Sequence, residues 1–115
     1  MRNVFVAILL ACALSATAIA QPSGQSEMLT VDNTSGGKAI TRAVLTGMGG
    51  CSLRLATAEI RWSIDQSNPP TTTYGQLMEV GDIVVFTNID QARNARFIRT
   101  TSTSGILAVQ CWPQS

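Results

Sequence analysis

The sequence predicts a small all-β domain, an antiparallel β-sandwich of the jelly-roll or immunoglobulin-like kind with about seven short strands. Three observations predict this fold. Short alternating or apolar runs are separated by Gly, Pro, Asn and Ser, and beyond residue 28 no stretch of about a dozen residues keeps the spacing of a helix. The chain has 115 residues, which is the length of one domain.

The first 20 residues differ from the rest of the chain. A charged start at Arg2 is followed by an apolar stretch over residues 4–14 and by the small residues Ala18 and Ala20. This is the layout of a secretory signal peptide. We therefore expect a signal peptide over residues 1–20, export to the periplasm, the cell surface or the medium, and no membrane span after cleavage.

Three alternatives to cleavage stay open. The segment could remain as a membrane anchor, although its apolar stretch is shorter than the roughly 18 residues that a span needs. Cys12 could carry a lipid, as in a bacterial lipoprotein. Translation could start at Met28, which would give a cytoplasmic protein. Residues 21–27 are polar with Pro and Gly, and we expect a flexible leader there, with the sandwich domain over residues 28–115.

Two cysteines remain once the signal peptide is set aside, Cys51 and Cys111. An even pair in an exported domain predicts one disulfide, which would close a loop of roughly sixty residues and stabilise the fold by about 4 kcal/mol. Both lie on the apolar face of an expected strand, so we expect the bridge to join two packed sheets. Two buried free thiols are the alternative.

The first half of the domain contains three expected strands and a corner. Strands are expected at residues 28–32, 39–46 and 51–55, separated by a turn at 33–37 and by the glycine-rich residues 47–50. In residues 51–55 the apolar side chains occupy odd positions, whereas in residues 58–64 they occupy even positions, with Ile60, Trp62 and Ile64 inward. This slip predicts a bulge or a tight corner near Thr57.

The second half continues the pattern. We expect strands at residues 78–80, 83–87, 96–100 and 106–112, a loop at 67–74, a turn at Gly81-Asp82 and one helical turn at 89–94. Residues 83–87 are nearly all apolar, which suits a central strand.

A corner is expected where the strand over residues 58–64 ends. The side chains of Asp65 and Asn68 can bond the backbone of a turn. Pro69 and Pro70 cannot donate to a sheet ladder. These four residues therefore predict a chain reversal, and calcium binding at Asp65 is only weakly indicated.

The composition excludes several activities. The chain has no histidine, so Ser-His-Asp and Cys-His catalysis are impossible, and no zinc motif is present. Glu59 and Asp65 would lie roughly 20 Å apart along a strand, too far for a glycosidase pair. Residues 21–115 carry seven basic and seven acidic side chains, without the basic excess of a nucleic-acid binder. We expect no catalytic residues, metal or cofactor.

Two groups of side chains are candidates for a binding surface. Trp62, Tyr74 and Trp112 could form a platform on which a glycan stacks. The alternative puts Trp62 in the core and Trp112 over the end of the last strand. Arg96 and Arg99 belong to the one basic cluster of the chain, with ion pairs to neighbouring aspartates as the alternative.

The order of these motifs resembles a known group of proteins. Ala58, Ile60, Arg61 and Trp62 precede the Asp65 loop with Pro70 and Thr71, then follow Gly75 and Leu77, the Gly81-Asp82 turn, Arg96 to Arg99, and Ser104 to Val109. This is similar to small β-sandwich proteins among the structural genes of tailed bacteriophages, which look like virion accessory or decoration proteins. The resemblance implies a stable, non-enzymatic module that binds protein partners or itself.

Two functions are therefore expected in order of preference. The first is an exported structural or interaction module, with a virion or a cell surface as its setting. The alternative is an exported module that binds a carbohydrate or another small ligand.

Overall fold

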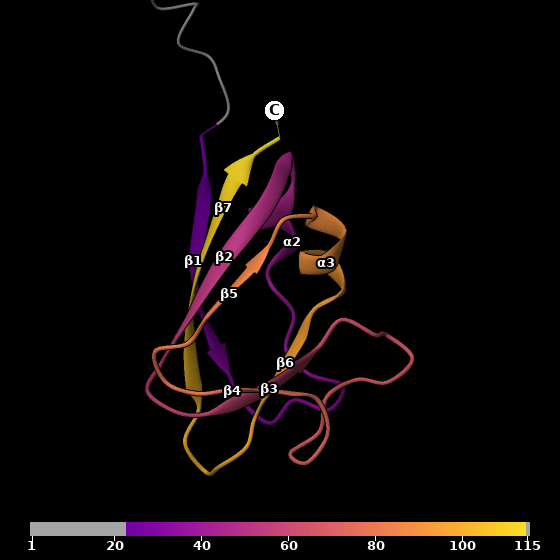
Figure 1. Ribbon diagram of the computed structural model, residues 1–115, viewed down its shortest axis with the longest axis vertical. Helices are drawn as coiled ribbons and strands as arrows, with labels where there is room; N and C mark the ends of the chain where they lie inside the picture. Colours follow the sequence, from indigo (N-terminus) through magenta and orange to yellow (C-terminus); the bar gives the residue numbers. More distant parts are fainter. Residues whose placement is uncertain (1–22, 115) are drawn as a thin grey trace, which may run out of the picture.

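The computed structural model describes residues 23–114 and has two antiparallel sheets (Figure 1). One sheet has four strands in the order β1 (Gln25–Val31), β7 (Gly105–Pro113), β2 (Met48–Ala56) and β5 (Ile83–Phe86). The other has three, in the order β4 (Gln76–Met78), β3 (Ile60–Ser63) and β6 (Arg96–Arg99). Two short helices are α2 (Arg42–Leu45) and α3 (Ile89–Asn94). The predicted all-β sandwich is confirmed.

The core lies between the two sheets. Alternate residues of each strand point inward, as in any half-buried sheet. The four-stranded sheet contributes Leu53, Leu107 and Val109, and the three-stranded sheet contributes Ile60 and Phe97, each almost or completely buried. The expected signal peptide at residues 1–20 and Cys12 lie outside the described residues. Among residues 23–114, no helix has the length and apolar character needed to cross a membrane.

The chain passes from one sheet to the other at Thr57. This residue has a φ of 75°, and the N–H of Ala58 bonds the carbonyl of Ala56 at 3.0 Å. A positive φ with an i to i+2 bond is a γ-turn, which is rare and strained for a β-branched residue. The Thr57 hydroxyl compensates in part by donating to the Ser104 carbonyl at 2.9 Å. The corner predicted from the slip in alternation is therefore present.

Strand β1 begins earlier than predicted. The expected leader over residues 21–27 is wrong for its last three residues, because Gln25 pairs with Cys111 and Glu27 with Val109. The carboxylate of Glu27 also accepts from the Thr41 N–H and hydroxyl, both at 2.7 Å. The polar composition misled the prediction, since an edge strand tolerates polar side chains that a central one does not.

The segment over residues 39–46 is not a strand, which corrects the prediction. It contains α2, whose Leu45 is buried, and Gly47 then turns the chain at a φ of 76°. Strand β2 starts at Met48 and runs through the glycines that were expected to break it. Gly50 is required there, since a Cβ atom would lie 2.4 Å from both the Phe86 carbonyl oxygen and the Trp112 ring.

The disulfide between Cys51 and Cys111 is confirmed. The expectation that it joins two packed sheets is wrong. Cys51 and Cys111 are direct cross-strand neighbours on β2 and β7 of the same sheet, with Cα atoms 4.0 Å apart. Both point inward on adjacent strands, so the bridge locks one strand pair from the core side.

Two further predictions are corrected at the edges. Ile64 is exposed, because strand β3 ends at Ser63 and the chain leaves the sheet there. Strand β5 is the last strand of its sheet, not a central one. The predicted helical turn, the Gly81-Asp82 turn and the two final strands are confirmed.

Candidate functional site

The three candidate aromatic residues do not form one platform. Trp62 lies on β3 and Tyr74 on the loop before β4, and both line the same hollow. Trp112 lies near the end of β7 and lines a different hollow with Asn88 and Asp90. Two of the three residues are therefore brought together, and the third stands over Gly50 on the outer face of the four-stranded sheet.

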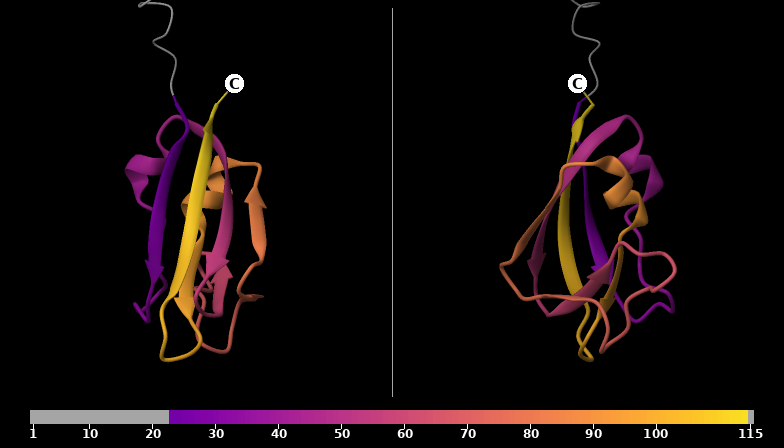
Figure 2. Two further views of the ribbon diagram at one scale, coloured as in Figure 1. Left: turned by 90° about the vertical axis from the view of Figure 1, so that its left-hand side faces the viewer. Right: turned by 45° about the vertical axis from the view of Figure 1, so that its right-hand side comes forward.

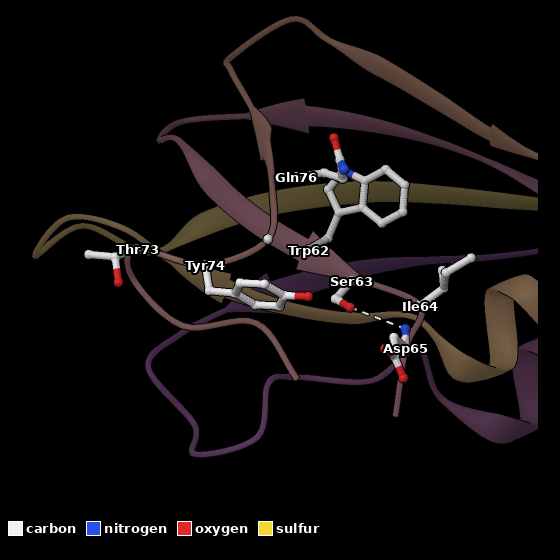
Figure 3. Close-up of a pocket in the computed structure, with 8 residues that line it drawn as sticks. Trp62, Ser63, Ile64, Asp65, Thr73, Tyr74 and Gln76 are labelled. Carbon is white, nitrogen blue, oxygen red and sulfur yellow. Dashed lines mark hydrogen bonds between the residues drawn. The ribbon is translucent and has the colours of Figure 1, made fainter. Parts of the chain in front are cut away.

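The hollow beside Trp62 and Tyr74 has a volume of about 550 Å³ (Figure 3). Its other walls come from the end of β3 and the two residues after it, and from the loop that leads into the first residue of β4. They are Ser63, Ile64, Asp65, Thr73, Gly75 and Gln76. In the view of Figure 3 the Tyr74 hydroxyl is directed toward the Ser63 side of the hollow. The walls thus combine two aromatic side chains with hydroxyl, amide and carboxylate groups, as ligand pockets do.

Trp62 serves both the core and the hollow. Its ring meets Phe86 of β5 edge to face, with ring centroids 5.5 Å apart and planes at 77°. This geometry is favourable for two aromatic rings. The side chain is half-buried and packs against the core, so the core interpretation of Trp62 holds in part, while its role in a glycan platform stays a prediction. Phe86 is the last residue of β5 and its side chain is buried. The contact therefore places Trp62 next to β5, across the core from the four-stranded sheet.

The loop that carries Tyr74 is held by local hydrogen bonds. The Thr71 hydroxyl accepts from the Tyr74 N–H at 2.9 Å, and the Thr71 N–H donates to the Tyr74 carbonyl at 3.0 Å. The Arg61 guanidinium donates to the carbonyls of Thr72 and Gly75 at 3.2 and 3.1 Å. These bonds fix both main-chain groups of Tyr74, so its exposed ring stands on an ordered support.

Asp65 has the hydrogen bonds of a corner residue. One carboxylate oxygen accepts from the Ser67 N–H at 3.0 Å, and the other accepts from the Asn68 side-chain amide at 2.8 Å. The Asp65 carbonyl accepts from the Asn68 N–H at 3.0 Å, which closes the turn. Pro69 is exposed and Pro70 is buried.

The same bonds make the turn sensitive to acid. Bonds from the Asn68 amide and the Ser67 N–H lower the pKa of Asp65 below its ordinary value of 3.8. A carboxyl whose pKa is lowered by folding stabilises the fold above its ordinary pKa, and this contribution is lost as the pH falls below it. We expect the NMR shifts of the Ser67 and Asn68 amides to titrate with a midpoint below 3.8. A midpoint at or above 3.8 would show that these bonds do not lower the pKa of Asp65.

The expected basic cluster is formed in part: Arg93 and Arg96 line one hollow together with Arg42, whereas Arg99 does not line it. Arg96 donates to the carbonyls of Arg93 and Ala95 at 2.8 and 2.9 Å, and Arg99 approaches the Ser104 hydroxyl at 3.5 Å. Arg93 pairs with Asp90 at 2.8 Å. Arg96 and Arg99 are half-buried, and each donates hydrogen bonds to residues close to it in the sequence.

No cluster of three acidic, cysteine or histidine side chains suited to a metal ion occurs within residues 23–114.

The open edge at β5 is a feature that the sequence did not reveal. In the left view of Figure 2, β5 is the outermost strand at one edge of its sheet, while α2 lies beside β1 at the opposite edge. Ile83 and Val85 are 60% and 53% exposed on the outer face of the sheet. An all-apolar run predicts burial, so the exposure of half of this run was not foreseeable from its composition.

The hydrogen-bond phase of the sheet determines which groups β5 leaves free. Leu55 accepts from the Gly81 N–H at 2.8 Å and donates to the Asp82 carbonyl at 3.1 Å. Leu53 and Cys51 follow in the same phase and face Val84 and Phe86. In an antiparallel ladder the intervening residues direct their N–H and C=O groups the other way. Ile83 and Val85 therefore point their main-chain groups out of the sheet.

The whole chain was compared with family models, curated proteins and solved structures, and none of them matches it. The resemblance to phage accessory proteins thus gains no support from these comparisons and remains a proposal.

Proposed function

We propose that this protein is an exported, non-enzymatic interaction module that assembles with a second copy of itself through strand β5. The observation that supports the proposal best is the unprotected edge. Natural sheets usually protect edges with charges, prolines, bulges or covering segments. The four residues of β5, Ile83–Phe86, include no charge and no proline, and no strand of residues 23–114 pairs with the outer edge of β5.

The edge is self-complementary. When two β5 strands pair antiparallel about a two-fold axis at Val84, Ile83 of one copy lies opposite Val85 of the other. Both residues direct main-chain groups outward, and each such pair exchanges two bonds, so the contact gains about four main-chain hydrogen bonds. The same patch serves both copies, as the symmetry of a dimer requires. Strand addition of this kind is a common mode of protein recognition.

Charge does not oppose this contact. Strand β5 is uncharged, and residues 21–115 carry equal numbers of basic and acidic side chains. Two copies therefore approach without net repulsion. Met28, which is 67% exposed on β1, lies on the same outer face but at the opposite edge of the sheet, outside the contact that Ile83 and Val85 would make. A strand pair of this length buries a small area, so we expect weak, reversible association.

Export and the lack of catalysis complete the proposal. The Cys51–Cys111 bridge is compatible with an oxidising environment outside the cytoplasm. The chain contains no histidine for acid–base chemistry at neutral pH. The resemblance to phage accessory proteins implies the same class of function, a stable module that works by binding.

Val85→Lys is expected to abolish self-association. The lysine places a charge beside the edge where the second strand pairs, and it projects to solvent from an already exposed position, so the fold is kept. Sedimentation velocity from about 5 μM to about 1 mM measures the effect, and we expect a dissociation constant between about 10 μM and 1 mM for the unchanged chain.

Met28→Lys is the matched control. It adds the same charge to the same sheet face, but on the strand at the opposite edge. We expect Met28→Lys to associate like the unchanged chain. A monomer at every concentration, or equal weakening by both substitutions, would refute assembly through β5. Binding of only a different protein at β5 would refute the second copy as its partner.

A further inference from the structure

We infer that the hollow between Trp62 and Tyr74 binds a neutral sugar ring, independently of assembly through β5. Tyr74 is 50% exposed, yet both of its main-chain groups are bonded to Thr71. A large exposed aromatic on a fixed turn loses little freedom when a ligand covers it. The aromatic side chains supply apolar faces for the C–H side of a sugar ring.

Gly75 determines the path of the chain between Tyr74 and β4. Gly75 has a φ of 121°, and a Cβ atom there would lie 2.9 Å from the Trp62 carbonyl oxygen. A glycine at this position therefore allows the chain after Tyr74 to pass directly against β3. This close approach brings Tyr74 and Gln76 to the same hollow as Trp62.

The polar walls indicate the class of ligand. Within residues 23–114 no lysine or arginine lines the hollow, which disfavours phosphates and acidic sugars. Each oxygen of the Asp65 carboxylate accepts one hydrogen bond from the turn, and a carboxylate has about four acceptor positions. Asp65 is exposed, so the remaining positions can accept hydrogen bonds from the donors of a ligand. Sugar hydroxyls are donors as well as acceptors, which suits the mixed walls.

A proline-rich peptide is the main competitor, because aromatic grooves also bind such segments. Proline has no N–H group and its ring carries no hydroxyl. Its carbonyl oxygens would face the Asp65 carboxylate without offering it a donor. The chemistry of the walls therefore favours the sugar.

The test uses the folded chain and three neutral probes, cellohexaose, chitohexaose and mannohexaose, with decaproline as the competing ligand. We expect at least one sugar to shift the NMR signals of Trp62 and Tyr74, with a dissociation constant between about 10 μM and 1 mM. Tyr74→Ala is expected to weaken this binding at least about tenfold, because it removes one aromatic wall. Tyr74→Phe keeps the ring and is expected to retain most of the affinity.

Trp112→Ala is the matched control, since it removes an exposed aromatic residue outside the hollow. We expect it to leave the affinity unchanged, as Val85→Lys should. The inference is overturned if none of the three sugars shifts the signals, if Trp112→Ala weakens binding as much as Tyr74→Ala, or if decaproline binds the hollow more tightly than the sugars. Because Val85→Lys tests assembly separately, failure of one proposal does not hide the other.

Discussion

Replacing both bridged cysteines, Cys51→Ala with Cys111→Ala, is expected to lower the free energy of unfolding by about 4 kcal/mol. The bridge closes a loop with a sequence separation of 60 residues, and its loss lets the unfolded chain regain that freedom. Both cysteines are also buried. Without the disulfide, strands β2 and β7 would be held together by packing and hydrogen bonds alone. For a domain of this size the melting temperature should fall by about 15 °C or more.

Calorimetry with and without a reducing agent measures this effect. Reduction should destabilise the unchanged chain about as much as the double substitution does, and it should leave the double variant unaffected. An unchanged melting temperature under reducing conditions would be incompatible with the bridge.

Phe97→Ala is expected to cost about 3–5 kcal/mol, the range for truncating a fully buried aromatic residue. Phe97 is completely buried on β6, opposite Trp62 of β3. Its backbone also bonds Lys38 in both directions, at 2.6 and 2.9 Å, which ties the segment before α2 to the three-stranded sheet. The substitution therefore opens a cavity where two parts of the fold meet.

Urea unfolding measures the loss, with two comparisons. Phe97→Leu keeps most of the volume and should cost about 1–2 kcal/mol. Tyr74→Ala truncates an exposed aromatic residue and should stay within about 0.5 kcal/mol of the unchanged chain. Equal costs for Phe97→Ala and Tyr74→Ala would show that Phe97 is not in the core.

The sequence was informative where apolar and polar residues alternate along a strand. Cys51, Leu53 and Leu55 alternate with polar residues, and all three are buried. The slip of this pattern at Thr57 located the corner between the sheets. Local alternation is enough in these cases, because a side-chain period of two follows from strand geometry itself.

The errors arose where neighbours far along the chain decide the structure. Polar residues 25–27 form a strand because β7 is available to pair with them. The apolar β5 lies at an edge because no further strand among residues 23–114 pairs with it. The candidate site also separates residues that are close in sequence from residues that are distant. Trp62, Tyr74 and Asp65 are close in sequence and meet at one hollow, whereas Trp112 is distant and does not.

Amide exchange at β5, followed by NMR at low and high protein concentration, tests assembly through this edge most directly. In dilute solution we expect fast exchange at Ile83 and Val85, whose N–H groups point out of the sheet, and slow exchange at Val84 and Phe86, which face β2. At concentrations that favour the dimer, exchange at Ile83 and Val85 should slow, and Val85→Lys should abolish this change. Equally fast exchange at both residues in solutions that sediment as dimers would contradict assembly through β5.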